Sequence, residues 1–331
     1  FAAGDTSADY RSALETYTLA TDYPALAFTP PRHVESQNVL HVDAVASHQD
    51  AWHITSFSGL HRSLEKQYSH AADDEPGAPV DGADTPFKGA AFGNALHTVL
   101  EYAETADWAA ASPQALQQGA LLPCRSALQA FGYAQALAET GAPILAGLVF
   151  NTLHGLLPEQ LRLLDLRHGD KRHELEFHLR INHAGSDAIL ALMHRHGYCL
   201  QRPHFGFQSR LHGLLTGKID LLYQSEGRVF ILDYKSNLLP AYDQAALAGA
   251  MQDSEYDLQY LLYSVAVHRW LKHKLGAAYE FSRTFGGIRY LFVRGMRPGL
   301  VDGIFCDVPP ADLIADLDAC FDSDTKDSHE R

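Results

Sequence analysis

The sequence is poor in cysteine, carries fewer basic than acidic residues and has no apolar run long enough to cross a membrane. Its four cysteines are scattered without a Cys-x-x-Cys pair, which argues against a structural zinc site or a disulfide framework and favours reduced, cytoplasmic thiols. No basic segment followed by an apolar one opens the chain, so we expect no signal peptide and no membrane association.

The balance of charges limits the kinds of partner that this chain can bind. Lysine and arginine number 26 against 40 aspartates and glutamates, giving a net charge of −14. Broad binding to duplex DNA rests on many Lys/Arg–phosphate contacts, and this balance argues against it. A basic series nevertheless runs through the middle of the chain: Arg162, Arg167, Lys171, Arg172, Arg180, Arg195, Arg202 and Arg210. A local basic track is therefore compatible with an acidic whole.

Residues 217–235, GKIDLLYQSEGRVFILDYK, form the most informative stretch. Two β-rich segments flank a turn-forming cluster, which predicts a hairpin. Counting outward from a turn centred between Glu226 and Gly227 sets Asp220 opposite Asp233. Because strand side chains alternate, Asp233 and Lys235 share a face. We therefore expect two carboxylates and one ammonium at one end of a largely buried hairpin.

This constellation has two interpretations. A strand-end aspartate paired with a lysine is common and needs no function. Alternatively, Asp220 and Asp233 hold a divalent cation such as Mg²⁺, which prefers carboxylate oxygens, and Lys235 orients water or stabilises charge developing on a phosphate. The second arrangement is that of the D…(D/E)-x-K nucleases. The hairpin pattern by itself favours neither interpretation.

Periodicity and turn signals predict mixed helices and strands along the rest of the chain. We expect strands over 52–57, 171–181 and 288–293, helices over 12–20, 90–105, 254–274 and 311–321, and a largely helical region over 106–160 with boundaries at its prolines, Pro113, Pro123, Pro143 and Pro158. Residues 70–88 read as an acidic loop and residues 184–212 as an irregular insertion, either solvated or lining a DNA channel. Tyr256 and Tyr260 offer rings for unpaired bases.

Several blocks occur in the order found in the RecB nuclease family, which this chain resembles from about residue 52 to 306. They are Thr55-Ser56-Phe57-Ser58-Gly59-Leu60, Gly93-x-x-x-His97, Glu174-Leu175-Glu176-Phe177, Gly217-x-Ile219-Asp220, Asp233-Tyr234-Lys235-Ser236, Tyr256-Asp257-Leu258-Gln259-Tyr260-x-x-Tyr263 and Phe285-Gly286-Gly287-Ile288-Arg289-Tyr290-Leu291-Phe292. Some blocks are shared with the broader PD-(D/E)xK superfamily. Some relatives carry a cysteine-ligated iron–sulfur cluster, which the cysteine spacing here does not support.

The resemblance implies a restriction-endonuclease-like α/β fold: a mixed central sheet flanked by helices, with helical insertions. It implies Mg²⁺-dependent hydrolysis of DNA, with one or two ions per site. Metal ligands would be His97, Asp220, Asp233 and the Tyr234 carbonyl, with Glu101 a supporting partner of His97. Lys235, Asp233, Asp220, Glu174, Gln259 and Tyr263 would be the catalytic set. Glu174 and Glu176 share a strand face, and the family pattern favours Glu174.

The family also implies a setting: single strands delivered by a helicase in a RecBCD-type exonuclease V, with the RecB helicase region, RecC, RecD and RecA as partners in the bacterial cytoplasm. Residues 1–50, including the Met-less start, fit a helicase remnant and linker, residues 51–310 the nuclease domain and residues 311–331 a tail. Two alternatives remain: a catalytically silent module for DNA binding or protein docking, and a stand-alone nuclease of this fold.

Overall fold

A mixed β-sheet organises the computed structural model, which describes residues 53–56, 86–204 and 210–322. The predictions for residues 1–50 and for most of the acidic loop lie outside these ranges. The six strands are β1 His53–Ser56, β2 Lys171–Gly185, β3 Arg210–Ser225, β4 Arg228–Lys235, β5 Phe285–Phe292 and β6 Ile304–Asp307. They confirm the predicted restriction-endonuclease-like α/β class.

Strand β3 organises the sheet. Along one edge it pairs with β2 in antiparallel register over almost its whole length. Its other edge is shared: the first half, 213–216, runs parallel to β1, and the second half, 221–225, runs antiparallel to β4. Strand β4 continues into parallel pairing with β5, and β6 closes the sheet. Residues 217–220 of β3 therefore lie where one edge passes from β1 to β4.

The β3–β4 turn sets this register. Glu226 and Gly227 have φ angles of 49° and 74°, the left-handed conformation that a two-residue hairpin turn of this kind needs at both positions. Ser225 then pairs with Arg228 and Leu221 with Leu232. The turn is centred where the sequence predicts it, so the predicted hairpin register is confirmed.

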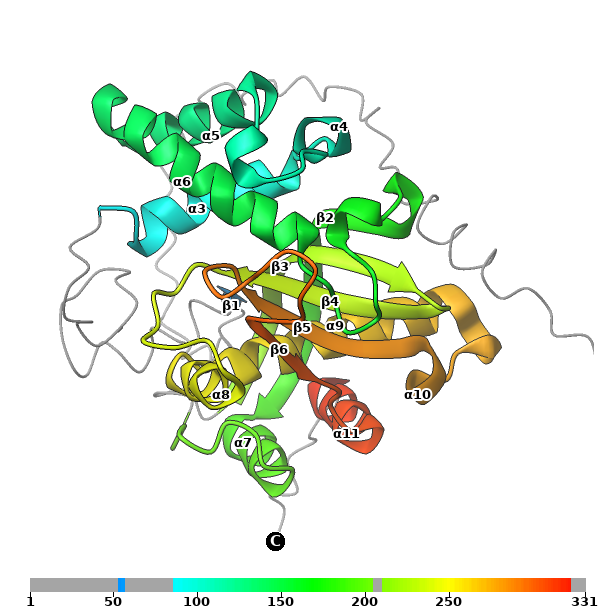
Figure 1. The fold of residues 1–331 in the computed structure, drawn as a ribbon. Coiled ribbons are helices and arrows are strands. Elements are labelled where there is room, and N and C mark those ends of the chain that lie inside the picture. Colours follow the sequence, from blue (N-terminus) through cyan, green and yellow to red (C-terminus); the bar gives the residue numbers. More distant parts are fainter. Residues whose placement is uncertain (1–52, 57–85, 205–209, 323–331) are drawn as a thin grey trace, which may run out of the picture.

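Helices cover both faces of the sheet (Figure 1). In the described part of the chain they are α3 Gly89–Glu101, α4 Thr105–Trp108, α5 Gln118–Ala130, α6 Gln135–His154, α7 Ser186–Arg195, α8 Gln244–Asp253, α9 Tyr256–Leu275, α10 Phe281–Thr284 and α11 Ala311–Asp322, with 3-10 turns at Pro113–Ala115, Leu163–Asp165, His168–Asp170 and Gly276–Ala278. One core joins α3, α5 and α6 to one face of the sheet, and a second joins α7, α8, α9 and α11 to the other. The predicted strands over 171–181 and 288–293 and helices over 90–105 and 254–274 are confirmed, with ends shifted by a few residues.

Helix α6 has the length and apolarity of a membrane span, but half of that window is buried. Leu145, Val149 and Phe150 lie in the core with the sheet and α5, as expected of a core helix.

Two predictions about the helical regions are wrong. Pro123 and Pro143 lie inside α5 and α6 and do not end them. Each removes one backbone donor, and burial of the apolar faces of both helices outweighs that loss. The supposedly irregular insertion after 184 contains α7, with Ile189, Leu190 and Met193 buried against the sheet.

Helix α11 covers the whole helix predicted over 311–321 and one residue beyond it. Its apolar residues Leu313, Ile314, Leu317 and Phe321 are buried in the same core as α9. The first part of the predicted C-terminal tail is therefore a packed element of this fold.

Candidate active site and metal centre

Strands β3 and β4 separate where the two predicted aspartates lie. Their pairing ends at Leu221 and Leu232, and β4 continues beside β5 as far as Lys235. In the gap, the Tyr234 N–H donates to Oδ2 of Asp220 at 2.8 Å. A side-chain carboxylate thus takes the place of a ladder carbonyl. The fork between the strands gathers Asp220 and Asp233 at one point of the sheet.

Glu174 reaches the same point from β2. His173 pairs with Leu221 and Leu175 with Ile219, so Glu174 lies beside Asp220. Its φ of 52° is left-handed, unusual for a non-glycine residue and found mainly where the surroundings require it. The distortion breaks the regular alternation of β2. Glu174 is half-buried near Asp220, whereas Glu176 is exposed.

His97 approaches the fork from α3. Its Nε2 donates to the Tyr234 carbonyl at 2.9 Å, and its Nδ1 lies 3.4 Å from Oδ1 of Asp220. Burial alone would lower the pKa of His97, but the Asp220 carboxylate outweighs it and raises the pKa to about 9. A Cβ on Gly93, one turn earlier, would lie 3.1 Å from Oγ of Ser236, so glycine lets α3 approach the end of β4 closely.

Lys235 and Asp233 form a buried ion pair, with Nζ and Oδ2 2.6 Å apart and side chains only 12% and 3% exposed. Nζ of Lys235 is the partner of that Oδ2. Burial raises the pKa of Asp233 to about 6, with the charge of Asp220 adding to the shift and Lys235 opposing it. For Asp220, burial is outweighed by His97, which lowers the pKa. Burial alone would lower the pKa of Lys235, but the Asp233 carboxylate outweighs burial and raises it.

A second set of contacts fixes the Lys235 ammonium. Oε1 of Gln259 accepts from Lys235 at 3.2 Å and from the Tyr290 hydroxyl at 2.8 Å. Nε2 of Gln259 donates to the Tyr263 hydroxyl at 3.1 Å. The ammonium also lies 4.0 Å from the centroid of the Tyr256 ring, a cation–π contact. The predicted association of Gln259 and Tyr263 with Lys235 is present in the geometry.

Other expectations about this region are wrong. Tyr256 and Tyr260 are buried, and Tyr260 donates to Asp307 at 2.9 Å, so neither ring can stack on DNA bases. Glu101 was expected to support His97, but it accepts a hydrogen bond from the Tyr102 hydroxyl, and the ring nitrogens of His97 face the Tyr234 carbonyl and Asp220. Arg202 is not part of the predicted basic track, because its side chain is buried and forms an ion pair with Glu255 at 2.6 Å.

Sequence reasoning missed two contributors. Tyr290 pairs across the sheet with Asp233, and Lys218 forms an ion pair with Glu174 at 2.6 Å. Tyr290 stands in the Phe285–Phe292 block, but only the strand order, with β5 beside β4, brings it to the site. Lys218 is the residue two before Asp220, and strand alternation could have identified it.

The donor set fits a hard divalent cation. His97, Glu174 and Asp220 each offer a ligand atom, and these atoms lie within 4.8 Å of one another. The Tyr234 carbonyl lies against His97, and the Asp233 carboxylate, paired with Lys235, is close enough to affect the pKa of His97, while its own pKa is affected by Asp220. Oxygen ligands with one imidazole and no thiolate suit ions such as Mg²⁺ or Mn²⁺.

Several known proteins have sequences similar to this one. RecBCD enzyme subunit RecB of Escherichia coli (strain K12) is 33% identical over 298 residues, covering 82% of this chain and 23% of that protein. RecB of Mycolicibacterium smegmatis is 31% identical over 330 residues, covering 83% and 29%. RecB of Haemophilus influenzae is 37% identical over 166 residues, covering 49% and 14%. The chain spans less than a third of the length of these relatives.

The model of the PD-(D/E)XK nuclease superfamily matches residues 55–302. That range contains the forked hairpin, His97, Glu174 and the Lys235–Gln259 contact. With the mixed sheet and its helical layers, this match shows that the chain belongs to the PD-(D/E)XK nuclease superfamily.

Proposed function

We propose that this chain is the nuclease domain of a RecB-type protein and hydrolyses phosphodiester bonds of DNA with Mg²⁺. The observation that carries the proposal is the forked β3–β4 hairpin, where Asp220, Asp233 and Lys235 meet His97 and Glu174. A structural ion pair needs one carboxylate and one cation. Three carboxylates converging at a strand break, one of them on a left-handed backbone, favour a metal-dependent site.

His97, Asp220, Asp233 and the Tyr234 carbonyl would hold one Mg²⁺. When bound, the ion supplies Lewis-acid polarisation of the phosphate and lowers the pKa of bound water. Glu174 is more exposed than Asp233, with 19% against 3% of its side chain accessible. It would accept a proton from the attacking water on the solvent side of the site, or contribute to a second cation position.

Lys235 would act on the reacting phosphate. Its ammonium is held by Asp233, Gln259 and the Tyr256 ring, so it is positioned before substrate arrives. A fixed cation facing the non-bridging oxygens stabilises the charge that develops as the new P–O bond forms. Gln259, through its bond to Tyr263, is a positioning residue for Lys235.

The biological setting follows from the relatives. Their name, RecBCD enzyme subunit RecB, supports a role in double-strand-break repair and recombination as part of an exodeoxyribonuclease V type complex in the bacterial cytoplasm. The substrate would be single strands delivered by the ATP-dependent helicase region of the same parent chain. RecC, RecD and RecA would be its partners. Residues 1–50 would be the remnant of the helicase region and the linker, residues 51–310 the nuclease domain with α11 packed on it, and the remainder of 311–331 a tail.

Degradation of end-labelled single-stranded DNA tests the proposal, with Mg²⁺ and with EDTA, for the wild type, Asp233→Ala and Asp318→Asn. Asp318 is a matched control, because it is also a buried, ion-paired carboxylate but lies in the α9–α11 contact. We expect metal-dependent cleavage that Asp233→Ala abolishes and Asp318→Asn retains. Calorimetry of Mg²⁺ binding and circular dichroism of each variant check the site and the fold.

Wild-type cleavage by a folded Asp233→Ala protein would overturn the site assignment. Mg²⁺ binding without cleavage of single strands, with or without a helicase that feeds them, would instead identify a silent module of the nuclease fold.

A further inference from the structure

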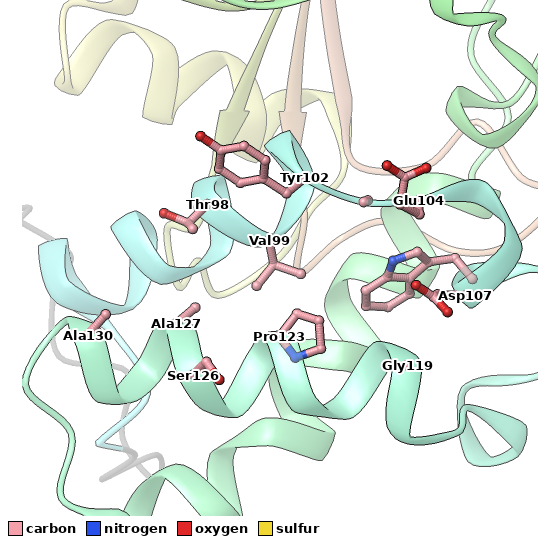
Figure 2. Close-up of a pocket in the computed structure, with 12 residues that line it drawn as sticks. Thr98, Val99, Tyr102, Glu104, Asp107, Gly119, Pro123, Ser126, Ala127 and Ala130 are labelled. Carbon is pink, nitrogen blue, oxygen red and sulfur yellow. The ribbon is translucent and has the colours of Figure 1, made fainter.

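A cavity of about 330 Å³ lies between α3 and α5 (Figure 2). Its walls come from the last turn of α3, from α4 and from α5. Val99 points toward Pro123 across it, and Tyr102 stands at its edge where α3 ends. The volume falls in the range of small-molecule sites, roughly 300–1,000 Å³.

The lining is suited to a flat, neutral ring. Val99, Pro123 and Ala127 supply apolar surface, and Thr98 and Ser126 supply hydroxyl groups. The charged groups among the lining residues are the carboxylates of Glu104 and Asp107, which would repel a phosphate. Both are exposed, so they lie at the rim. The cavity therefore fits a nucleobase better than the DNA backbone.

Tyr102 lines the cavity and ends α3, the helix that carries His97. Its side chain is 72% exposed, the most exposed large apolar group in the part of the chain that the structure describes. Its hydroxyl donates to Glu101, which raises its pKa, and the nearby charge of Glu174 adds to that shift. Tyr102 lies five residues beyond His97, about 7.5 Å along the helix axis.

We propose that Tyr102 and the α3–α5 cavity form a nucleobase subsite for the nucleotide next to the scissile phosphate of single-stranded DNA. This proposal rests on the proposed function. Stacking on an exposed aromatic ring accepts any base and is the usual way in which proteins hold single strands. A strand whose phosphate reaches His97 and Asp220 would place the neighbouring base on the Tyr102 ring, with its edge toward Thr98 and Ser126.

Thymidine oligonucleotides carrying one 2-aminopurine at successive positions give a direct readout, because stacking quenches this base. The oligonucleotides are titrated in Mg²⁺ with the Lys235→Met protein, in which slowed cleavage preserves the strand. The same titration is made with this protein carrying in addition Tyr102→Ala, Tyr102→Phe, Ser126→Tyr or Phe131→Ala. Phe131→Ala is the matched control, since Phe131 is an exposed aromatic outside the cavity lining. Free 2-aminopurine deoxyriboside distinguishes a strand-bound base from a loose nucleoside.

We expect quenching at one or two adjacent positions. Tyr102→Ala should abolish it and weaken binding by about 5- to 100-fold, the range for loss of one base–aromatic stack. Tyr102→Phe and Phe131→Ala should behave as the parent protein, and Ser126→Tyr, which fills the cavity, should reduce quenching. The free nucleoside should show no quenching at the same concentration. Unchanged quenching and affinity in Tyr102→Ala would overturn the subsite.

The two proposals fail separately. A wild type that cleaves DNA while its Tyr102→Ala form cleaves with unchanged KM and kcat would leave the nuclease assignment intact and remove the subsite. Position-specific quenching that depends on Tyr102 in a protein that never cleaves DNA would support the subsite and remove the nuclease assignment.

Discussion

Two carboxylates buried beside the same sheet have opposite surroundings. Glu159 receives Arg289 Nε at 3.0 Å on Oε1 and the Tyr223 hydroxyl at 3.0 Å on Oε2, so both oxygens are bonded. Oδ2 of Asp233 meets the Lys235 ammonium at 2.6 Å, and Asp220 lies next to it across the fork. The first arrangement pairs one carboxylate with one guanidinium. The second brings two carboxylates together beside one ammonium.

The difference separates a structural ion pair from the pair that we propose to be catalytic. In a buried structural pair, removal of either partner is costly, because it leaves the other as an unpaired buried charge. A site that must bind a cation and a phosphate has to keep acceptors open, and it accepts some electrostatic strain to do so. Asp233, with its pKa raised to about 6, shows that strain. Substitutions in each cluster test whether the two differ in this way.

The largest effect is expected at the structural pair. Arg289→Met would leave Glu159 buried with Tyr223 as its remaining partner, and breaking a buried pair costs about 3–5 kcal/mol of unfolding free energy. Urea denaturation followed by circular dichroism measures it. The double variant Arg289→Met/Glu159→Met should recover much of that loss, because it removes both charges. A single variant as stable as the wild type would show that this pair is not structural.

The next effect is on chemistry. Lys235→Met should lower the cleavage rate by about 10²–10³-fold, the effect of removing one fixed group that stabilises developing charge. Because Lys235 is not a proposed metal ligand, calorimetry should still detect Mg²⁺ binding. Arg289→Met, corrected for the folded fraction, should cleave within a few-fold of the wild type. A Lys235→Met rate equal to the wild-type rate would show that this ammonium serves stability alone.

The hairpin shows how far sequence reasoning reaches. Turn chemistry at Glu226 and Gly227 fixed the register and so placed Asp220 beside Asp233, because a two-residue turn leaves only one pairing. The approach of His97 and the choice of Glu174 came from the family pattern. Ligand atoms of both residues lie within 4.8 Å of one another and of Asp220, and their roles stay predictions. The class of fold followed from mixed periodicities and the same family pattern.

The strand order was beyond reach, and with it the position of Tyr290, because parallel pairing of β4 with β5 depends on packing between distant segments. The left-handed backbone at Glu174 breaks the alternation on which strand arguments rest. Tyr256 and Tyr260 were predicted to offer rings for unpaired bases, and both are buried. Their helix is buried by the sheet and α11, which no local pattern of its own sequence indicates.

Asp318, which lies beside His268 and Arg269, has a pKa shifted in the opposite direction from that of Asp233. For Asp318, burial would raise the pKa, but hydrogen bonds from His268 and Arg269 outweigh it and lower the pKa to about 2. A lowered folded-state pKa stabilises the protein above the unfolded pKa of about 4, and this stability is lost as pH falls toward 2. We expect a loss of about 2 kcal/mol over that window.

The difference in unfolding free energy between the wild type and Asp318→Asn, measured in urea from about pH 6 down to about pH 3, isolates this contribution. It should shrink as the pH falls below about 4. A difference that stays constant would mean that Asp318 is not the group responsible.

The smallest effect is expected where an ion pair is neither buried nor catalytic. Arg125 of α5 bonds Glu139 of α6 at 2.7 Å, but the side chains are 30% and 49% exposed. Solvent screening reduces such pairs to about 0–1 kcal/mol, so Arg125→Met should change the urea midpoint little. The substitution is the same as in Arg289→Met, which makes burial the main difference between them. A loss of about 3 kcal/mol or more at Arg125 would show that burial does not explain the contrast between the pairs, and that contacts of the arginine stem do.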